Sequence, residues 1–151
     1  MPSIRLFYLI TVITFSVMGQ KKTTFDIQGH RGARGLMPEN TIPAFLLALD
    51  SGVTTVELDL AITADNRIVV SHEPWMAASI CLDSSGHAIS EKDEKQFNIY
   101  KMTYEQVRQF DCGSKVNDRF PQQAKMKVAK PLLEDVIVAV EDHIKSKTLF
   151  E

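Results

Sequence analysis

The sequence predicts an α/β fold with parallel strands, because short β-type segments alternate with segments of helical apolar spacing. Residues 25–28 predict a strand, residues 42–49 carry apolar side chains at helical spacing, and residues 53–62 are rich in β-branched residues with period-2 alternation. A strand, a helix and a second strand within about forty residues form a βαβ unit, whose strands should lie parallel. An amphipathic helix after Pro131 and the start of another strand at residues 148–150 continue the alternation.

The first helix is marked by its ends as well as by its apolar positions. Asn40 is the expected N-cap, Pro43 falls in the first turn, where a missing N–H costs little, and Gly52 ends the helix. The apolar positions at i, i+3, i+4 and i+7 are Ile42, Phe45, Leu46 and Leu49. After the second strand, the Asp-Asn pair at 65–66 predicts a tight turn into another strand at residues 67–70.

The pattern weakens between residues 76 and 130, which we expect to be an insertion. Residues 83–95 are mostly polar and predict a surface excursion. Thr-Tyr-Glu-Gln at 103–106 is a capping box, so a short helix should begin there and end at residues 112–113. The helix after the insertion has acidic residues in its first turn, which favours helix formation. Its apolar stripe comprises Leu132, Leu133, Val136, Ile137, Val140 and Ile144.

Residues 1–19 have the features of a signal peptide. Arg5 supplies a positive charge, residues 6–17 are mainly apolar, and residues 17–19 suit a signal peptidase, which would leave Gln20 as the mature N-terminus. We therefore expect an exported protein, periplasmic or secreted, without a stable membrane anchor; an uncleaved N-terminal anchor is the alternative. The balance of 17 Lys and Arg against 19 Asp and Glu gives no reason to expect nucleic-acid binding.

The chain has two cysteines, Cys81 and Cys112. Oxidising compartments permit disulfides, so one bridge between them is an expectation for an exported protein. Such a bridge would close a loop within the polar segment and restrain the unfolded chain. Two unpaired thiols whose side chains never approach each other are the alternative.

Two acidic residues occupy alternate positions of the second predicted strand. Glu57 and Asp59 would share one face, with their Cα atoms roughly 6–7 Å apart. Two carboxylates at that distance repel each other unless a positive group lies between them. A hard divalent cation with oxygen ligands would remove the repulsion. A solvated strand face is the alternative, and an isolated Glu-x-Asp is compatible with it.

Other functional side chains also follow predicted strands. His30 and Arg31 come directly after the first strand, in a glycine-rich turn, and His72 follows the strand beyond the Asp-Asn turn. Loops at the carboxyl ends of parallel strands gather functional groups, and a guanidinium suits a phosphate. Together with the two acids, these residues predict a metal-assisted acid/base site. His87 and His143 fit a structural role better.

Several ordered motifs resemble the signature of the glycerophosphodiester phosphodiesterases. They cover nearly all of residues 25–145 in a compatible order and spacing. The motifs are GHRG at 29–32, PENT at 38–41, ELD at 57–59, TAD at 63–65, VSHE at 70–73, MTYE at 102–105 and KPLLEDV at 130–136. The family often has His-Asp where this chain has His72 and Glu73, and we expect little change from that difference.

The resemblance implies a TIM (β/α)8 barrel, of which this chain is the N-terminal part, with the insertion after His72. It also implies metal-dependent hydrolysis of glycerophosphodiesters to glycerol 3-phosphate and an alcohol. His30 and His72 would be the acid/base pair, and Arg31 would hold the phosphate. Glu57 and Asp59 would bind a divalent cation, Ca²⁺ or Mg²⁺.

The chain is short for such a barrel, which typically takes about 250 residues. We therefore expect residues 20–151 to be the N-terminal part of a longer protein, an open arc with the site residues on one rim, inactive alone. The family's third acidic metal ligand comes from the next strand, where Glu151 is the candidate. Two alternative functions are a phospholipase of the same superfamily acting on lipids and a non-catalytic exported binding module.

Overall fold

The computed structural model describes residues 25–148. Strand β1 (Gln28–Gly29) pairs in parallel with β2 (Thr55–Val56), and helix α2 (Ile42–Asp50) connects them. The predicted βαβ unit is therefore confirmed, although both strands are shorter than expected. The signal peptide predicted at residues 1–19, the predicted strand residues 149–150 and the candidate ligand Glu151 lie outside the described residues.

The N-cap of helix α2 lies one residue after the predicted cap, Asn40. Thr41 is the N-cap, because its backbone is extended and its side-chain oxygen accepts a hydrogen bond from the N–H of Ala44 at 3.4 Å. Asn40 instead adopts a positive φ of 57° and directs its side-chain amide to Asp59. The helix ends at Asp50, and Gly52 follows with a φ of 84°, as a helix-ending glycine should.

The prediction of one continuous strand at residues 53–62 is wrong. The chain forms β2, leaves the ladder at residues 57–59, and enters a second strand, β3 (Leu60–Ile62). This strand pairs antiparallel with β4 (Ile68–Val70) through a turn in which Asn66 has a φ of 59°. The predicted turn is confirmed, and the hairpin it closes draws residues 60–62 away from β1.

The segment at 76–130 contains two 3₁₀ turns, η1 (Glu94–Gln96) and η2 (Ile99–Lys101), and the short helix α3 (Tyr104–Val107). Thr103 and Gln106 form the predicted capping box. The helix ends at Val107, before the expected end at residues 112–113. Cys81 and Cys112 form a disulfide, which settles the choice between a bridge and two free thiols.

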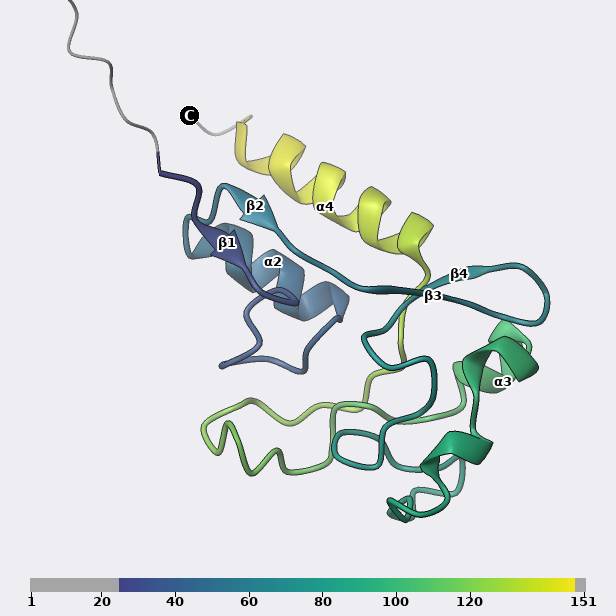
Figure 1. Cartoon of the computed structure of the whole chain (residues 1–151). Coiled ribbons are helices and arrows are strands. Elements are labelled where there is room, and N and C mark those ends of the chain that lie inside the picture. The colour runs from purple at the N-terminus through teal and green to yellow at the C-terminus, as the bar shows by residue number, and fades with distance from the viewer. Residues whose placement is uncertain (1–24, 149–151) are drawn as a thin grey trace, which may run out of the picture.

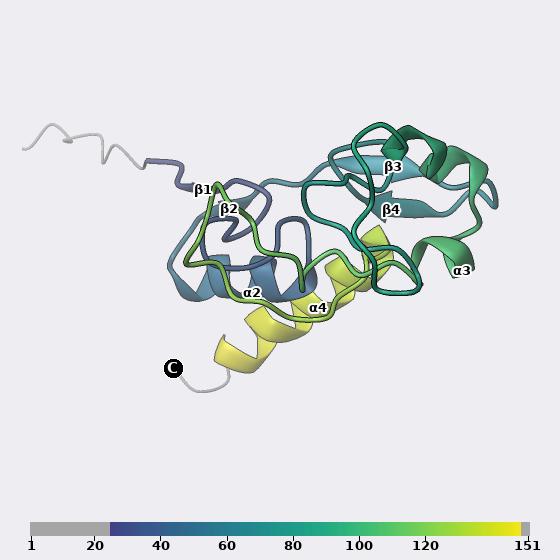
Figure 2. The same ribbon diagram turned by 90° about the horizontal axis from the view of Figure 1, so that it is seen from below.

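Helix α4 (Leu133–Thr148) packs against α2, and both helices lie on the same side of the strands (Figure 2). Thr148 is the last residue of this helix rather than the start of a strand. Val136 is buried, as its place in the apolar stripe predicts, whereas Ile137 is 48% exposed. The described residues contain no closed barrel, and none of their helices is long and apolar enough to cross a membrane.

Strand β4 divides two hydrophobic cores, because neighbouring strand residues point to opposite faces. Val70 packs with Phe45 and Val136 between α2 and α4. Val69 packs with the buried apolar residues of the inserted segment, including the disulfide. The inserted segment lies below the strand pairs and α4 above them in Figure 1. One short strand thus fixes the insertion relative to the βαβ unit.

Candidate active site

The glycine-rich turn after β1 has a backbone that only certain residues can adopt. Gly32 has a φ of 78°, and a Cβ at this position would lie 2.7 Å from the carbonyl carbon of Ala44 in α2. Arg31 has a φ of 51°, so its N–H donates to Oε2 of Glu57 at 2.8 Å. Its carbonyl accepts the N–H of Asn40 at 3.0 Å. The turn thereby holds Arg31 against the acidic segment that follows β2.

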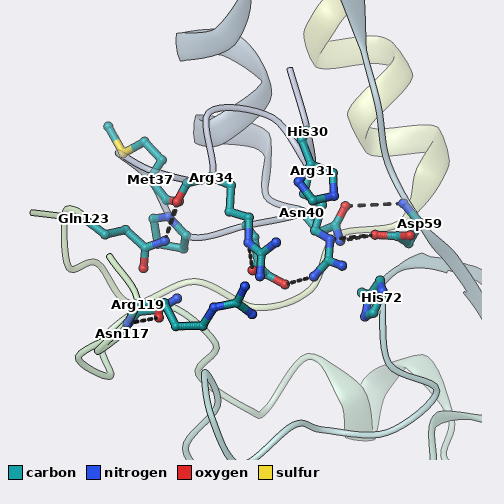
Figure 3. Close-up of polar contacts among 12 residues, drawn as sticks. His30, Arg31, Arg34, Met37, Asn40, Asp59, His72, Asn117, Arg119 and Gln123 are labelled. Atoms are coloured by element: carbon teal, nitrogen blue, oxygen red, sulfur yellow. Dashed lines mark hydrogen bonds and ion pairs between the residues drawn. The ribbon is translucent and has the colours of Figure 1, made fainter. Parts of the chain in front are cut away.

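The Arg31 side chain is nearly buried between two carboxylates. Nη1 donates to Oε1 of Glu39 at 2.7 Å, and Nε lies 3.3 Å from Oδ2 of Asp59. The Nε–H is not directed at that oxygen, so the second contact is an ion pair without a hydrogen bond. The same Asp59 oxygen accepts the side-chain N–H of Asn40 at 3.0 Å. Figure 3 shows Arg31, Asn40 and Asp59 grouped in this way.

The predicted histidines occupy different environments. Nδ1 of His72 lies 2.7 Å from Oε1 of Glu73, and this contact orients the ring. The N–H of Ser71 donates to the Asp59 carbonyl at 2.9 Å, which brings the end of β4 beside the acidic segment. His30 is 61% exposed, and its Nε2 lies 4.0 Å from Oε2 of Glu57.

A cavity of about 280 Å³ lies beside these groups, near the small end of the range of about 300–1,000 Å³ that ligand pockets occupy. Its lining includes Arg31 from the first turn, His72 and Glu73 after β4, and Arg119 from the inserted segment. His30 does not line this cavity but faces a second, more open hollow on the other side of the turn. The other two histidines lie outside the cavity: Nε2 of His143 is 2.6 Å from Oδ1 of Asp50, and Nδ1 of His87 is 3.7 Å from Oδ1 of Asp83.

The structure thus joins four of the five predicted residues by direct contacts. His30 reaches Glu57, and Arg31 reaches both Glu57 and Asp59. His72 joins this group through the cavity that it shares with Arg31.

The acidic pair supplies part of a ligand set for a hard cation. The side chains of Glu57 and Asp59 remain 36% and 27% exposed, and carboxylate oxygens are what Ca²⁺ and Mg²⁺ prefer. Within residues 25–148, no group of three His, Cys, Asp or Glu side chains is placed to hold a metal ion. The two carboxylates supply oxygen donors of the kind such an ion takes, but Oε2 of Glu57 and Oδ2 of Asp59 already contact Arg31.

Four charged residues that line the cavity had no role in the sequence-based prediction: Arg34, Glu39, Arg119 and Lys130. Glu39 places its second carboxylate oxygen 2.6 Å from Nε of Arg34, so one acid faces two guanidinium groups. Lys130 is 4% exposed, and burial lowers its pKa to about 8, although the charges of Glu39, Glu73 and Asp59 oppose that shift. No local signal separates Lys130 from Lys125 and Lys127, which alternate with apolar residues in the same segment but are exposed.

The inserted segment is tied directly to the first turn. Nε2 of Gln123 donates to the carbonyls of Arg34 at 2.8 Å and Met37 at 2.9 Å (Figure 3). The N–H of Ala124 donates to the carbonyl of Leu36 at 2.8 Å. These bonds hold the segment that carries Arg119 against the loop that carries Arg31 and Arg34.

Residues 30–150 match the sequence profile of the Glycerophosphoryl diester phosphodiesterase family. The chain belongs to this family. It is 51% identical over 88 residues to the Bacillus subtilis protein YhdW, provisionally named a glycerophosphodiester phosphodiesterase, covering 58% of this chain and 31% of that protein. It is 29% identical over 115 residues to another Bacillus subtilis protein, a glycerophosphodiester phosphodiesterase, covering 72% of this chain and 33% of the relative.

Solved structures show the same relationship. A Silicibacter pomeroyi protein, provisionally named a glycerophosphoryl diester phosphodiesterase, matches with a TM-score of 0.71 and 35% identity over 78% of this chain and 41% of that one. An Oleispira antarctica phosphodiesterase, solved with the product sn-glycerol-3-phosphate, matches with a TM-score of 0.57 and 24% identity over 79% of this chain and 41% of that one, which shows a shared fold alone. The chain spans about two fifths of these structures, so it corresponds to part of a TIM barrel.

Proposed function

We propose that the full-length protein hydrolyses glycerophosphodiesters to glycerol 3-phosphate and an alcohol, in a reaction that requires a divalent cation. The observation that carries this proposal is the buried Arg31 guanidinium, which lines the same cavity as His72. A fixed guanidinium matches a phosphate in geometry and charge. Membership of a phosphodiesterase family supports the reaction class.

The proposed chemistry breaks the P–O bond to the departing alcohol. Water bonds to phosphorus directly, or the neighbouring glycerol hydroxyl of the substrate does so first and water then opens the resulting cyclic phosphate. In both routes Arg31 balances charge on the phosphate oxygens. One histidine takes the proton of the attacking group, and the other gives a proton to the departing alkoxide. The contact between Nδ1 of His72 and Glu73 leaves Nε2 free to face the substrate.

Glu57 and Asp59 are the residues that would hold the cation. When bound, a divalent cation neutralises charge on the phosphate and polarises it. The Asn40 amide, which bonds to Asp59, would keep that carboxylate oriented.

We also propose that the protein is exported after cleavage of residues 1–19. The Cys81–Cys112 disulfide supports this assignment, since such bridges persist in oxidising compartments. Mass spectrometry of the protein recovered from periplasm or medium should give an N-terminus at Gln20. A mature N-terminus at Met1 would contradict the proposal.

The activity is tested with the full-length protein and glycerophosphocholine, by measuring released glycerol 3-phosphate. Turnover should stop on chelation and return when Mg²⁺ or Ca²⁺ is added. Arg31→Lys and His72→Ala should each reduce kcat/KM by 100-fold or more, as losses of charge stabilisation and acid/base catalysis typically do at about 10²–10⁴-fold. Turnover that survives chelation would exclude the metal role.

Two further arms separate the alternative functions. Phospholipid vesicles replace glycerophosphocholine in one, and faster release of product from vesicles would indicate a phospholipase. Calorimetry replaces the turnover assay in the other, because a binding module would take up the phosphodiester without consuming it. Either result would overturn the proposed reaction.

A further inference from the structure

Lys130 lines the active-site cavity although it was not predicted to belong to the site. The antiparallel bridge between Val69 and Leu132 places the segment before α4 beside β4, and the N–H of Val70 donates to the carbonyl of Pro131 at 2.9 Å. Lys130 therefore lies beside the end of β4, from which the chain continues to His72. The hydroxyl of Tyr104 also donates to the Lys130 carbonyl, at 3.3 Å.

Lys130 is a buried residue whose ammonium has no direct protein partner in the described part of the chain and lies at the cavity. Within residues 25–148 the ammonium makes no hydrogen bond or ion pair, and the nearby acids are already engaged. Glu39 is shared by two arginines, and Glu73 contacts His72. An ammonium on a largely buried side chain, with no ion-pair partner among the described residues, favours a counter-charge in the cavity.

The charges around the cavity indicate the sign of that missing partner. Four cationic side chains line it, namely Arg31, Arg34, Arg119 and Lys130, against the two carboxylates of Glu39 and Glu73. Such an excess of positive charge in a small cavity favours an anion. Because Arg31 and His72 belong to the same lining, the anion would sit where the proposed reaction occurs.

We propose that the Lys130 ammonium binds a phosphate oxygen of the substrate and of its phosphomonoester product, together with Arg31. This assignment rests on the proposed function and adds a substrate-contacting residue supplied by the end of the inserted segment. Lys130 makes no bond to phosphorus and transfers no proton in the reaction. It positions the phosphate and balances its charge.

The first test measures phosphate binding rather than turnover. Inorganic phosphate and sn-glycerol 3-phosphate are titrated calorimetrically into the full-length protein and into Lys130→Met, in the presence of chelator. A hydrogen bond to a charged group contributes about 1.5–3 kcal/mol, so Kd should rise roughly 10- to 100-fold. Lys127→Met is the matched control, because Lys127 is an exposed lysine of the same segment and its loss should leave Kd unchanged.

A second measurement does not depend on Lys130→Met being folded. Phosphate is added to the wild-type protein, and the ammonium resonances of the lysines are followed by NMR, with Lys130 assigned through Lys130→Arg. The Lys130 signal should shift and that of Lys127 should not. An unshifted Lys130 signal, or a Kd unchanged in Lys130→Met, would overturn the assignment.

The outcomes also separate this inference from the proposed function. Phosphate binding that depends on Lys130 in a protein that does not hydrolyse glycerophosphocholine would keep the assignment of the anion site and refute the reaction. Normal hydrolysis with wild-type kcat/KM in both Lys130→Met and Lys130→Arg would keep the reaction and refute the role of Lys130.

Discussion

Oε1 of Glu39 accepts a hydrogen bond from Nη1 of Arg31 at 2.7 Å, in a position where both side chains are almost buried. The second oxygen of the same carboxylate lies 2.6 Å from Nε of Arg34. One acid therefore balances two guanidinium groups of the cavity. Arg31 keeps a fixed orientation while the cavity retains a net positive charge for a ligand.

Glu39→Gln should destabilise the protein strongly, because it removes the carboxylate partner of Arg34 and one of the two carboxylates that face Arg31. The expected loss in the free energy of unfolding is about 3–5 kcal/mol, measured by urea denaturation. Glu105→Gln is the control, since it breaks an exposed ion pair with Arg108 and should cost less than about 1 kcal/mol. Equal losses in the two variants would contradict this account of Glu39.

Gly32→Ala should be more damaging than other glycine replacements with the same backbone conformation. The new Cβ would overlap the backbone of Ala44 and the residue would also keep a positive φ, so we expect a loss of about 2–4 kcal/mol. Gly86→Ala isolates the backbone effect, because Gly86 has a φ of 83° with open space around it. Thermal unfolding measures both, and a Gly32→Ala variant no less stable than Gly86→Ala would exclude the steric contribution.

Removal of the disulfide should lower stability mainly through the unfolded chain. Cys81 and Cys112 are 31 residues apart, and closing a loop of that size contributes about 3–4 kcal/mol in the chain-entropy account. The double variant Cys81→Ala/Cys112→Ala should show this loss in urea denaturation. Added reductant should destabilise the wild type and leave the double variant unchanged.

Lys130 should give stability an unusual dependence on pH. Burial lowers its pKa from 10.5 to about 8, so between those pH values the unfolded chain holds a proton that the folded chain has released. The free energy of unfolding contributed by this residue should therefore rise as pH increases from 8 to 10.5, by at most about 3 kcal/mol. The difference between wild type and Lys130→Met in phosphate-free buffer isolates this effect, and a difference that stays constant with pH would contradict it.

The contacts among His30, Arg31, Glu57 and Asp59 could be predicted because they follow from chain order. In a βαβ unit the ends of both parallel strands meet at one edge, so residues just beyond them come together. The continuous strand at residues 53–62 could not be corrected from its pattern, since the alternation does not show where a strand changes partner. That change depends on pairing with β4.

Other parts of the site depend on non-local geometry that leaves no local signal. Asn40 is a good N-cap by type, but it takes a left-handed conformation that turns its amide toward Asp59, and the cap passes to Thr41. Lys130 reaches the cavity through the bridge between Val69 and Leu132, which joins segments more than sixty residues apart. Sequence periodicity carries no information about such a pairing.

The bonds from Gln123 have a consequence for the growing chain. The Gln123 amide donates to carbonyls that precede it by 89 and 86 residues. The loop that carries Arg34 and Met37 is therefore synthesised long before Gln123. At about 5–20 residues per second, that interval is roughly 4–18 s. During this time the loop lacks its bonds to Gln123, so the complete site can form only after residue 123 has been synthesised.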